Sequence, residues 1–151
     1  MRLTATPVRR FLTSKHISDF RKNGYAVFKN YIDGEQCRQA RTRIDEIIKE
    51  QIAIEPKPNI FQDDFDITGA LVESADKIRL FYEPKAIIDG KFLYSREQSV
   101  NKVGHNLHTL EPIFQSITFN EKTREMLRGL GYEQPVVPQS MAILKPQKIG
   151  G

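Results

Sequence analysis

The sequence has 151 residues, of which 39% are hydrophobic and 28% charged, a balance typical of a globular protein rather than of a disordered or fibrous one. This length corresponds to one ordinary domain. No apolar run approaches the roughly 20 residues that a membrane-spanning helix needs, so we expect no membrane partner. The single cysteine excludes an internal disulfide framework and favours a reducing, intracellular compartment.

The net charge of +4 comes from the first part of the chain. Residues 1–58 carry 12 Lys+Arg against 7 Asp+Glu, whereas residues 59–151 carry 11 against 12. The surplus begins in a basic N-terminal extension, residues 1–16, which is either a targeting segment or a frayed terminus. Nucleic-acid interfaces concentrate basic side chains on one face, and the mixed charges of this chain do not. We therefore expect no nucleic-acid partner.

Two helices are predicted in the first third of the chain. Thr13 is a suitable N-cap and Gly24 a suitable C-terminal cap for the first helix. Asp33, followed three residues later by Gln36, resembles the capping box that opens a longer helix. Between the two helices, residues 25–28 (YAVF) are predicted to form a short strand.

The second helix has one apolar face. Its apolar residues recur at spacings of three and four, the period of a helix that is buried on one side: Cys37, Ala40, Ile44, Ile47, Ile48 and Ile52. The outer face carries charges of both signs, which favours simple solvation. On this pattern the lone cysteine is predicted to be an inert core residue.

Strands and helices are mixed in the second half of the chain. Residues 77–83 alternate apolar and other side chains, as a half-buried strand does. Residues 95–117 place apolar side chains at helical spacing, and a further helix is predicted from the cap Asn120 to Gly131. Residues 139–144 alternate again and form a last strand. The overall order indicates an α+β fold.

Three potential metal ligands lie close together in the predicted helix of residues 95–117. With helical backbone, His105, His108 and Glu111 would lie on nearly one side. Such a group could ligate a metal. We favour the alternative, in which two histidines beside a loop satisfy backbone groups, because Gly104 and Pro112 interrupt the segment.

Four blocks of the sequence, in this order and spacing, resemble the phytanoyl-CoA dioxygenase family: ISDFRKNGYAVFKNYIDGEQC, DKIRLFYEP, NKVGHNLHTLEPIFQSIT and PVVPQSMAILKPQKIGG. The resemblance covers residues 17–151. Family members are non-haem iron enzymes that consume 2-oxoglutarate and oxygen. The resemblance implies that residues 17–151 are the N-terminal helical and first-strand portion of a double-stranded β-helix, a jelly-roll, cupin-like fold that is truncated here.

The resemblance also implies two cosubstrate-binding residues. Lys102 would complement a carboxylate of 2-oxoglutarate, and Met141 would wall the pocket. The alternative is a solvated lysine and a core methionine. The family's metal-binding pair, a histidine and an aspartate separated by one residue, does not occur in this sequence. We therefore expect no metal ligand and no catalytic residue within the 151 residues.

The function implied is that of an N-terminal portion of an Fe(II)/2-oxoglutarate-dependent dioxygenase. The complete protein would be a monomer that hydroxylates an unknown small molecule, with Fe(II) and 2-oxoglutarate required and ascorbate a candidate reductant. This chain alone is expected to be inactive and not to bind iron. The alternative, from another class, is a non-catalytic interaction module or regulatory short isoform that uses the basic first half or residues 139–144 to bind a partner.

Overall fold

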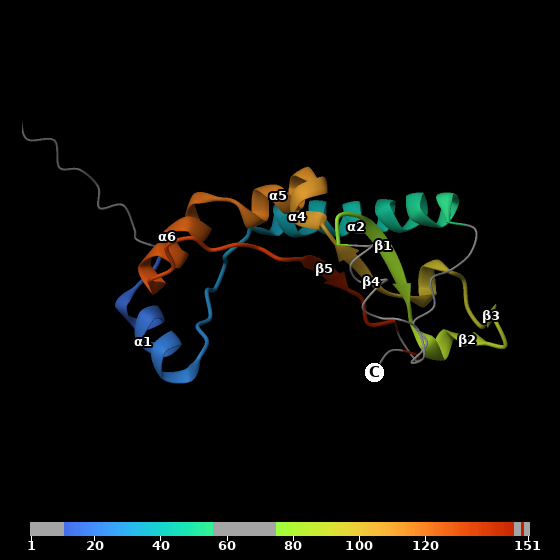
Figure 1. Cartoon of the computed structure of the whole chain (residues 1–151), viewed down its shortest axis with the longest axis horizontal. Coiled ribbons are helices and arrows are strands. Elements are labelled where there is room, and N and C mark those ends of the chain that lie inside the picture. The colour runs from blue at the N-terminus through green and yellow to red at the C-terminus, as the bar shows by residue number, and fades with distance from the viewer. Residues whose placement is uncertain (1–10, 56–74, 147–148, 150–151) are drawn as a thin grey trace, which may run out of the picture.

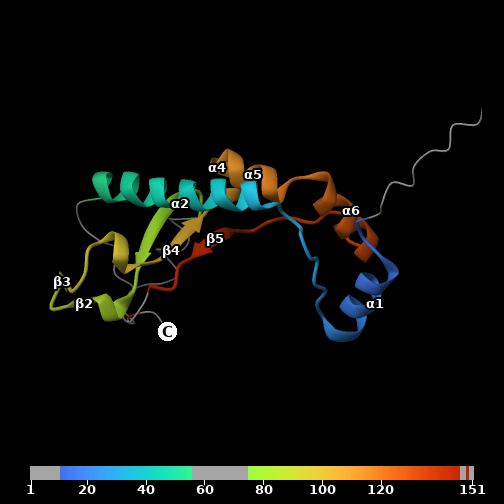
Figure 2. The ribbon, with the colours of Figure 1, turned by 180° about the vertical axis from the view of Figure 1, so that it is seen from behind.

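The computed structural model describes residues 11–55, 75–146 and 149. They form an α+β arrangement in which one long helix, α2, runs along a three-stranded antiparallel sheet (Figure 1). Helices α1 and α6 lie together at one end of the molecule and the small β2–β3 hairpin lies at the other, as the reverse view also shows (Figure 2). The predicted α+β class is confirmed.

The first two helices begin where their caps predict. Helix α1 spans Ser14–Asn23, with the Thr13 side chain accepting from the His16 backbone N–H, and Gly24 after it adopts φ 80°. Helix α2 spans Gly34–Ile54 and opens with the predicted Asp33–Gln36 capping box. Each cap satisfies backbone donors that the first turn leaves without a helical partner.

The central sheet has the strand order β1-β4-β5. Strand β1 (Ile78–Tyr82) pairs antiparallel with β4 (Val100–His105), and β4 pairs antiparallel with β5 (Ser140–Ile143). Two short 3₁₀ helices flank a separate hairpin of two-residue strands; these elements are η1 (Pro84–Ala86), β2 (Ile87–Ile88), β3 (Lys91–Phe92) and η2 (Glu97–Ser99).

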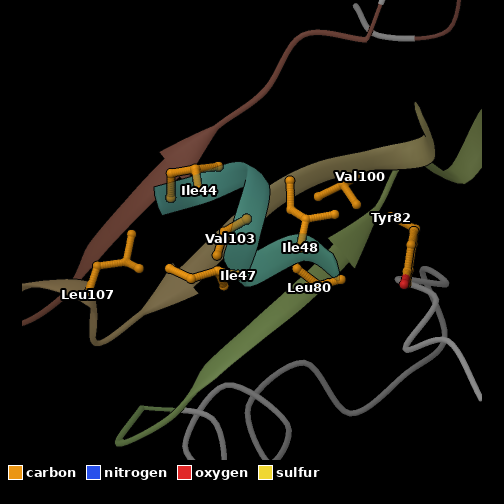
Figure 3. Packing of buried hydrophobic residues seen from close by; sticks show 8 residues of the cluster. All are labelled: Ile44, Ile47, Ile48, Leu80, Tyr82, Val100, Val103 and Leu107. Carbon is orange, nitrogen blue, oxygen red and sulfur yellow. The ribbon is translucent and has the colours of Figure 1, made fainter. Parts of the chain in front are cut away.

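The hydrophobic core lies between α2 and one face of the sheet (Figure 3). The helix contributes three isoleucines, and strands β1 and β4 and the start of α4 (Leu107–Leu110) contribute the residues that face them: Ile44, Ile47, Ile48, Leu80, Tyr82, Val100, Val103 and Leu107. Ala142 in β5 and Leu144, directly after that strand, pack against this cluster. Burial of this apolar face is what holds the helix on the sheet.

Three further helices follow β4 in the described part of the chain. They are α4 (Leu107–Leu110), α5 (Pro112–Thr118) and α6 (Glu121–Leu130), the last capped by Asn120 and ended by Gly131 at φ 97° as predicted. Glu111, between α4 and α5, accepts two hydrogen bonds from Arg43 of α2, at 2.7 and 3.0 Å. Hydrogen bonds to Glu111 and Glu50 raise the pKa of the Arg43 guanidinium. The bonds between Arg43 and Glu111 connect these helices to α2.

The prediction of helix at Val100 and Val103 is wrong, because residues 100–105 form strand β4. Residues three apart normally face opposite sides of a strand. Here the register shifts between Phe81 and Tyr82, so that Tyr82 pairs with Val100 while Phe81 pairs with Lys102. This bulge leaves one extra residue in β4 and turns both valines toward the core, which imitates helical spacing.

The predicted strand at residues 25–28 is also wrong. No strand is assigned there; the Phe28 ring lies 5.1 Å from that of Phe11 and 4.3 Å from that of His16, while Tyr25 and Val27 are exposed. The core position of Cys37 is the third wrong prediction, because its side chain is exposed. Cys37 lies in the first turns of α2, whereas the buried positions of that helix begin at Ile44.

Candidate functional site

The candidate site lies on the face of the sheet opposite α2. Two rows of cross-strand neighbours cross that face, one formed by Phe81, Lys102 and Ile143 and the other by Arg79, Gly104 and Met141. Between them runs the row of Leu80, Val103 and Ala142, which points to the core. The alternation of side chains along each strand therefore separates the two faces.

The two predicted cosubstrate residues share this face. Lys102 lies in the central strand and is half-buried, directly across from Ile143 of β5. Met141 lies two residues before Ile143, and its side chain is 37% exposed. Diagonal neighbours on adjacent strands are within reach of long side chains. The structure thus brings together, on paired strands, two residues that are 39 positions apart in the sequence.

The surroundings of Lys102 combine apolar and aromatic groups with charge. Phe81, its neighbour on β1, is buried, and the Phe81 ring lies 4.9 Å from that of His105. Arg79, in the next row, donates to the Glu55 carboxylate at 2.7 Å. A cationic side chain held beside apolar walls can recognise a small carboxylate, because the apolar walls exclude water from the ion pair.

Gly104 is a close neighbour of Met141 that our sequence analysis did not identify. A Cβ atom at Gly104 would lie 2.7 Å from Met141 Cγ and 3.5 Å from both Cβ and Sδ of that residue. The Met141 side chain therefore lies directly against the β4 backbone. The sequence signal was present, since a glycine within a strand often marks a place where another group approaches closely.

The His105, His108 and Glu111 group does not form a metal site. His105 is in β4 rather than in a helix, and His108 Nδ1 lies 2.7 Å from the Ser140 hydroxyl. Glu111 is occupied by Arg43. Across residues 11–55, 75–146 and 149, no three His, Cys, Asp or Glu side chains are grouped so that they could hold a metal ion.

A concave region lies away from the sheet. It is a hollow of about 1010 Å³ between α1, residues 25–30 and the start of α6, with Lys15, Lys29 and Lys122 among its lining residues. Lys15 is paired with Asp19 at 2.7 Å, and Lys122 donates to the Tyr31 carbonyl at 3.1 Å. Neither Lys102 nor Met141 lines this hollow.

None of the helices in the described part of the chain combines the length and apolarity that crossing a membrane requires.

The family model for phytanoyl-CoA dioxygenase matches residues 20–151, so the chain belongs to the phytanoyl-CoA dioxygenase family. Phytanoyl-CoA dioxygenase domain-containing protein 1 of Danio rerio is 36% identical in an alignment that covers 93% of this chain and 51% of that protein. The homolog of that protein in Caenorhabditis briggsae is 33% identical over 88% of this chain and 48% of its own length.

A plant relative gives the same result. Phytanoyl-CoA dioxygenase of Arabidopsis thaliana is 34% identical over 93% of this chain and 50% of its own length. The chain therefore spans about half the length of the curated relatives it matches. The resemblance found in the four sequence blocks is confirmed at the level of the family.

Proposed function

We propose that this chain is the 2-oxoglutarate-binding portion of an Fe(II)/2-oxoglutarate-dependent dioxygenase. The observation that carries the proposal is the placement of Lys102 and Met141 on the same face of paired strands, beside buried Phe81. The Lys102 ammonium would hold one carboxylate of 2-oxoglutarate through a charge-assisted hydrogen bond. Met141 would form an apolar wall beside the carbon chain of the cosubstrate.

The iron ion that this function requires is not assigned to the described residues. In this family it supplies the activation of oxygen, coupled to decarboxylation of 2-oxoglutarate to succinate. The described residues do not fit it, because His108 and Glu111 have protein partners and no three donor side chains converge. The sequence also contains no H-x-D or H-x-E. We therefore assign the iron ligands to polypeptide outside this sequence, and the hydroxylated substrate stays unassigned.

Replacement of Lys102 tests the proposal. In a full-length polypeptide that carries this sequence, Lys102→Met should weaken 2-oxoglutarate binding about ten- to a hundredfold, because one charge-assisted contact contributes roughly 1.5–3 kcal/mol. Affinity for the metal should change much less. Isothermal titration calorimetry with each ligand measures both effects. The matched control is Lys91→Met, which removes the same charge from the separate β2–β3 hairpin. Unchanged 2-oxoglutarate affinity in Lys102→Met would refute the assignment.

A non-catalytic interaction module is the second candidate function. Leu144 N donates to Asn101 O at 2.7 Å, so by alternation the backbone groups of Met141 and Ile143 point away from β4. Within the described residues β5 pairs only with β4, and Ile143 is 62% exposed. An exposed edge of this kind can accept a strand from a partner. The reading frame after codon 151 discriminates between the two candidate functions. Continuation into H-x-D favours the enzyme, and a stop codon favours the interaction module.

A further inference from the structure

The contact between Gly104 and Met141 leaves no room for a side chain at position 104. Ordinary contact with a Cβ atom begins at 3.4 Å, and the position that a Cβ would take at Gly104 is 2.7 Å from Met141 Cγ. Cγ is near the root of the methionine side chain, so it cannot move aside as easily as the terminal methyl group. A methyl group at position 104 would therefore lift the Met141 side chain off the sheet.

At Gly104 it is a steric contact, and not a positive φ, that opposes a side chain. Among the described residues, the glycines with positive φ are Gly24, Gly90 and Gly131, and Gly104 is not one of them. Alanine is thus compatible with the φ angle at position 104, and its cost arises where its methyl group meets Met141. Lys102 lies two residues earlier in the same strand and on the same face, so a lifted Met141 side chain would move over the face that carries the lysine.

We propose that Gly104 is a positioning residue that determines the length of the 2-oxo acid accepted at this face. By holding Met141 flat on β4, Gly104 keeps room for the five-carbon chain of 2-oxoglutarate beside Lys102, while the thioether limits entry of the six-carbon homologue 2-oxoadipate. The proposal rests on the proposed function, because it assumes that Lys102 and Met141 contact the 2-oxo acid. An apolar wall can discriminate between two ligands that differ by one methylene group.

The test compares three variants with wild type in the full-length polypeptide that carries this sequence. Gly104→Ala should weaken 2-oxoglutarate binding about tenfold and 2-oxoadipate binding more, because overpacking displaces Met141 into the site. Met141→Ala should improve 2-oxoadipate binding relative to 2-oxoglutarate. The double variant Gly104→Ala/Met141→Ala should bind both ligands as Met141→Ala alone does, since an alanine at position 141 retains only the Cβ atom, 3.5 Å from the new methyl group.

The ratio of the dissociation constants for 2-oxoglutarate and 2-oxoadipate distinguishes a positioning role of Gly104 from a general loss of stability. A merely destabilised protein would bind both acids less well by the same factor, whereas displacement of Met141 changes the ratio. Gly34→Ala is the matched control, because a Cβ there would meet only Arg38 Nη1 at an ordinary 3.6 Å. It should leave both constants unchanged.

The outcomes distinguish this inference from the function on which it rests. If Lys102→Met weakens 2-oxoglutarate binding but Gly104→Ala leaves the ratio at its wild-type value, the role of Gly104 is refuted and the proposed function stands. An effect of Gly104→Ala that Met141→Ala does not relieve also refutes it. If Gly104→Ala does not fold, the proposal still requires the double variant Gly104→Ala/Met141→Ala to fold and to bind both acids. A double variant that does not fold or does not bind them counts against the proposal. If wild type binds no 2-oxoglutarate, both proposals fall.

Discussion

Tyr82 is a buried phenol in the core between α2 and the sheet. Its hydroxyl is contacted by Nη2 and Nε of Arg96, at 2.9 and 3.2 Å, and Arg96 also donates to the Glu55 carbonyl at 2.7 Å. Burial raises the pKa of Tyr82 above its usual value, an effect that the nearby Arg96 charge partly offsets. Through Arg96, which directly precedes η2, the buried Tyr82 of β1 is therefore connected to the end of α2.

This raised pKa predicts a loss of stability in alkali. The contribution of Tyr82 is fully present below the unfolded-state pKa of about 10 and is lost as the pH rises through the higher folded-state pKa. Urea unfolding at pH 9 and pH 11 should therefore show a larger fall for wild type than for Tyr82→Phe. At pH 7 the variant should be about 1 kcal/mol less stable, because it loses the Arg96 contacts.

The control for this experiment is the exposed Tyr132. Tyr132→Phe should follow the wild-type curve at both pH values. An equal alkaline loss in wild type and Tyr82→Phe would contradict the prediction and would place the sensitivity elsewhere in the chain.

At the scale of elements, α2 is held on the sheet by few side chains. Ile47 is 1% exposed and lies in the centre of the cluster, whereas Ile54, in the last turn of the same helix, is 69% exposed. Ile47→Ala should lower the free energy of unfolding by about 2–5 kcal/mol, because it removes buried methyl groups and leaves a cavity. Ile54→Ala should change it by less than about 0.5 kcal/mol. Urea denaturation followed by circular dichroism measures both, and equal losses would contradict the core assignment.

Strand β5 should be the least protected strand of the central sheet. Its outer edge has no partner among the described residues, and both Val136, which precedes it, and Ile143, its last residue, are strongly exposed. Amides of residues 136–144 should exchange with solvent faster than those of residues 36–51 in α2, since segments with few buried contacts open at low free-energy cost. Hydrogen exchange read by mass spectrometry measures this difference. Slow exchange through Met141 would contradict this prediction and would indicate that both edges of β5 are protected.

For the whole molecule, we predict no 2-oxoglutarate turnover by the 151-residue chain alone. The physical reason is that no three donor side chains converge in the described residues and the sequence has no H-x-D. Succinate formation with Fe(II), ascorbate and 2-oxoglutarate is the measurement. Turnover that disappears in the double variant His105→Ala/His108→Ala would contradict the prediction and identify those histidines as ligands. The chain should also self-associate in size-exclusion light scattering, because the outer edge of β5 has no partner among the described residues and β5 carries exposed apolar side chains.

Local features of this protein were determined by the sequence. The caps at Thr13, Asp33 and Asn120 are chemical signals confined to three or four residues, and all three helices begin there. The alternation in residues 77–83 likewise predicted β1, because side chains of a strand alternate whatever its partner. The four sequence blocks were sufficient to identify the family.

Only the tertiary structure decided which face each strand residue occupies and which residues meet. Val100 and Val103 share the core face because the pairing of β1 with β4 shifts by one residue, an event that depends on two segments and not on one. Gly104 and Met141 touch because β4 pairs with β5 in one register, and a slip of one residue would turn Met141 toward the core. Sequence alone named Lys102 and Met141 by resemblance, whereas their common face and the glycine beneath the methionine follow from strand pairing.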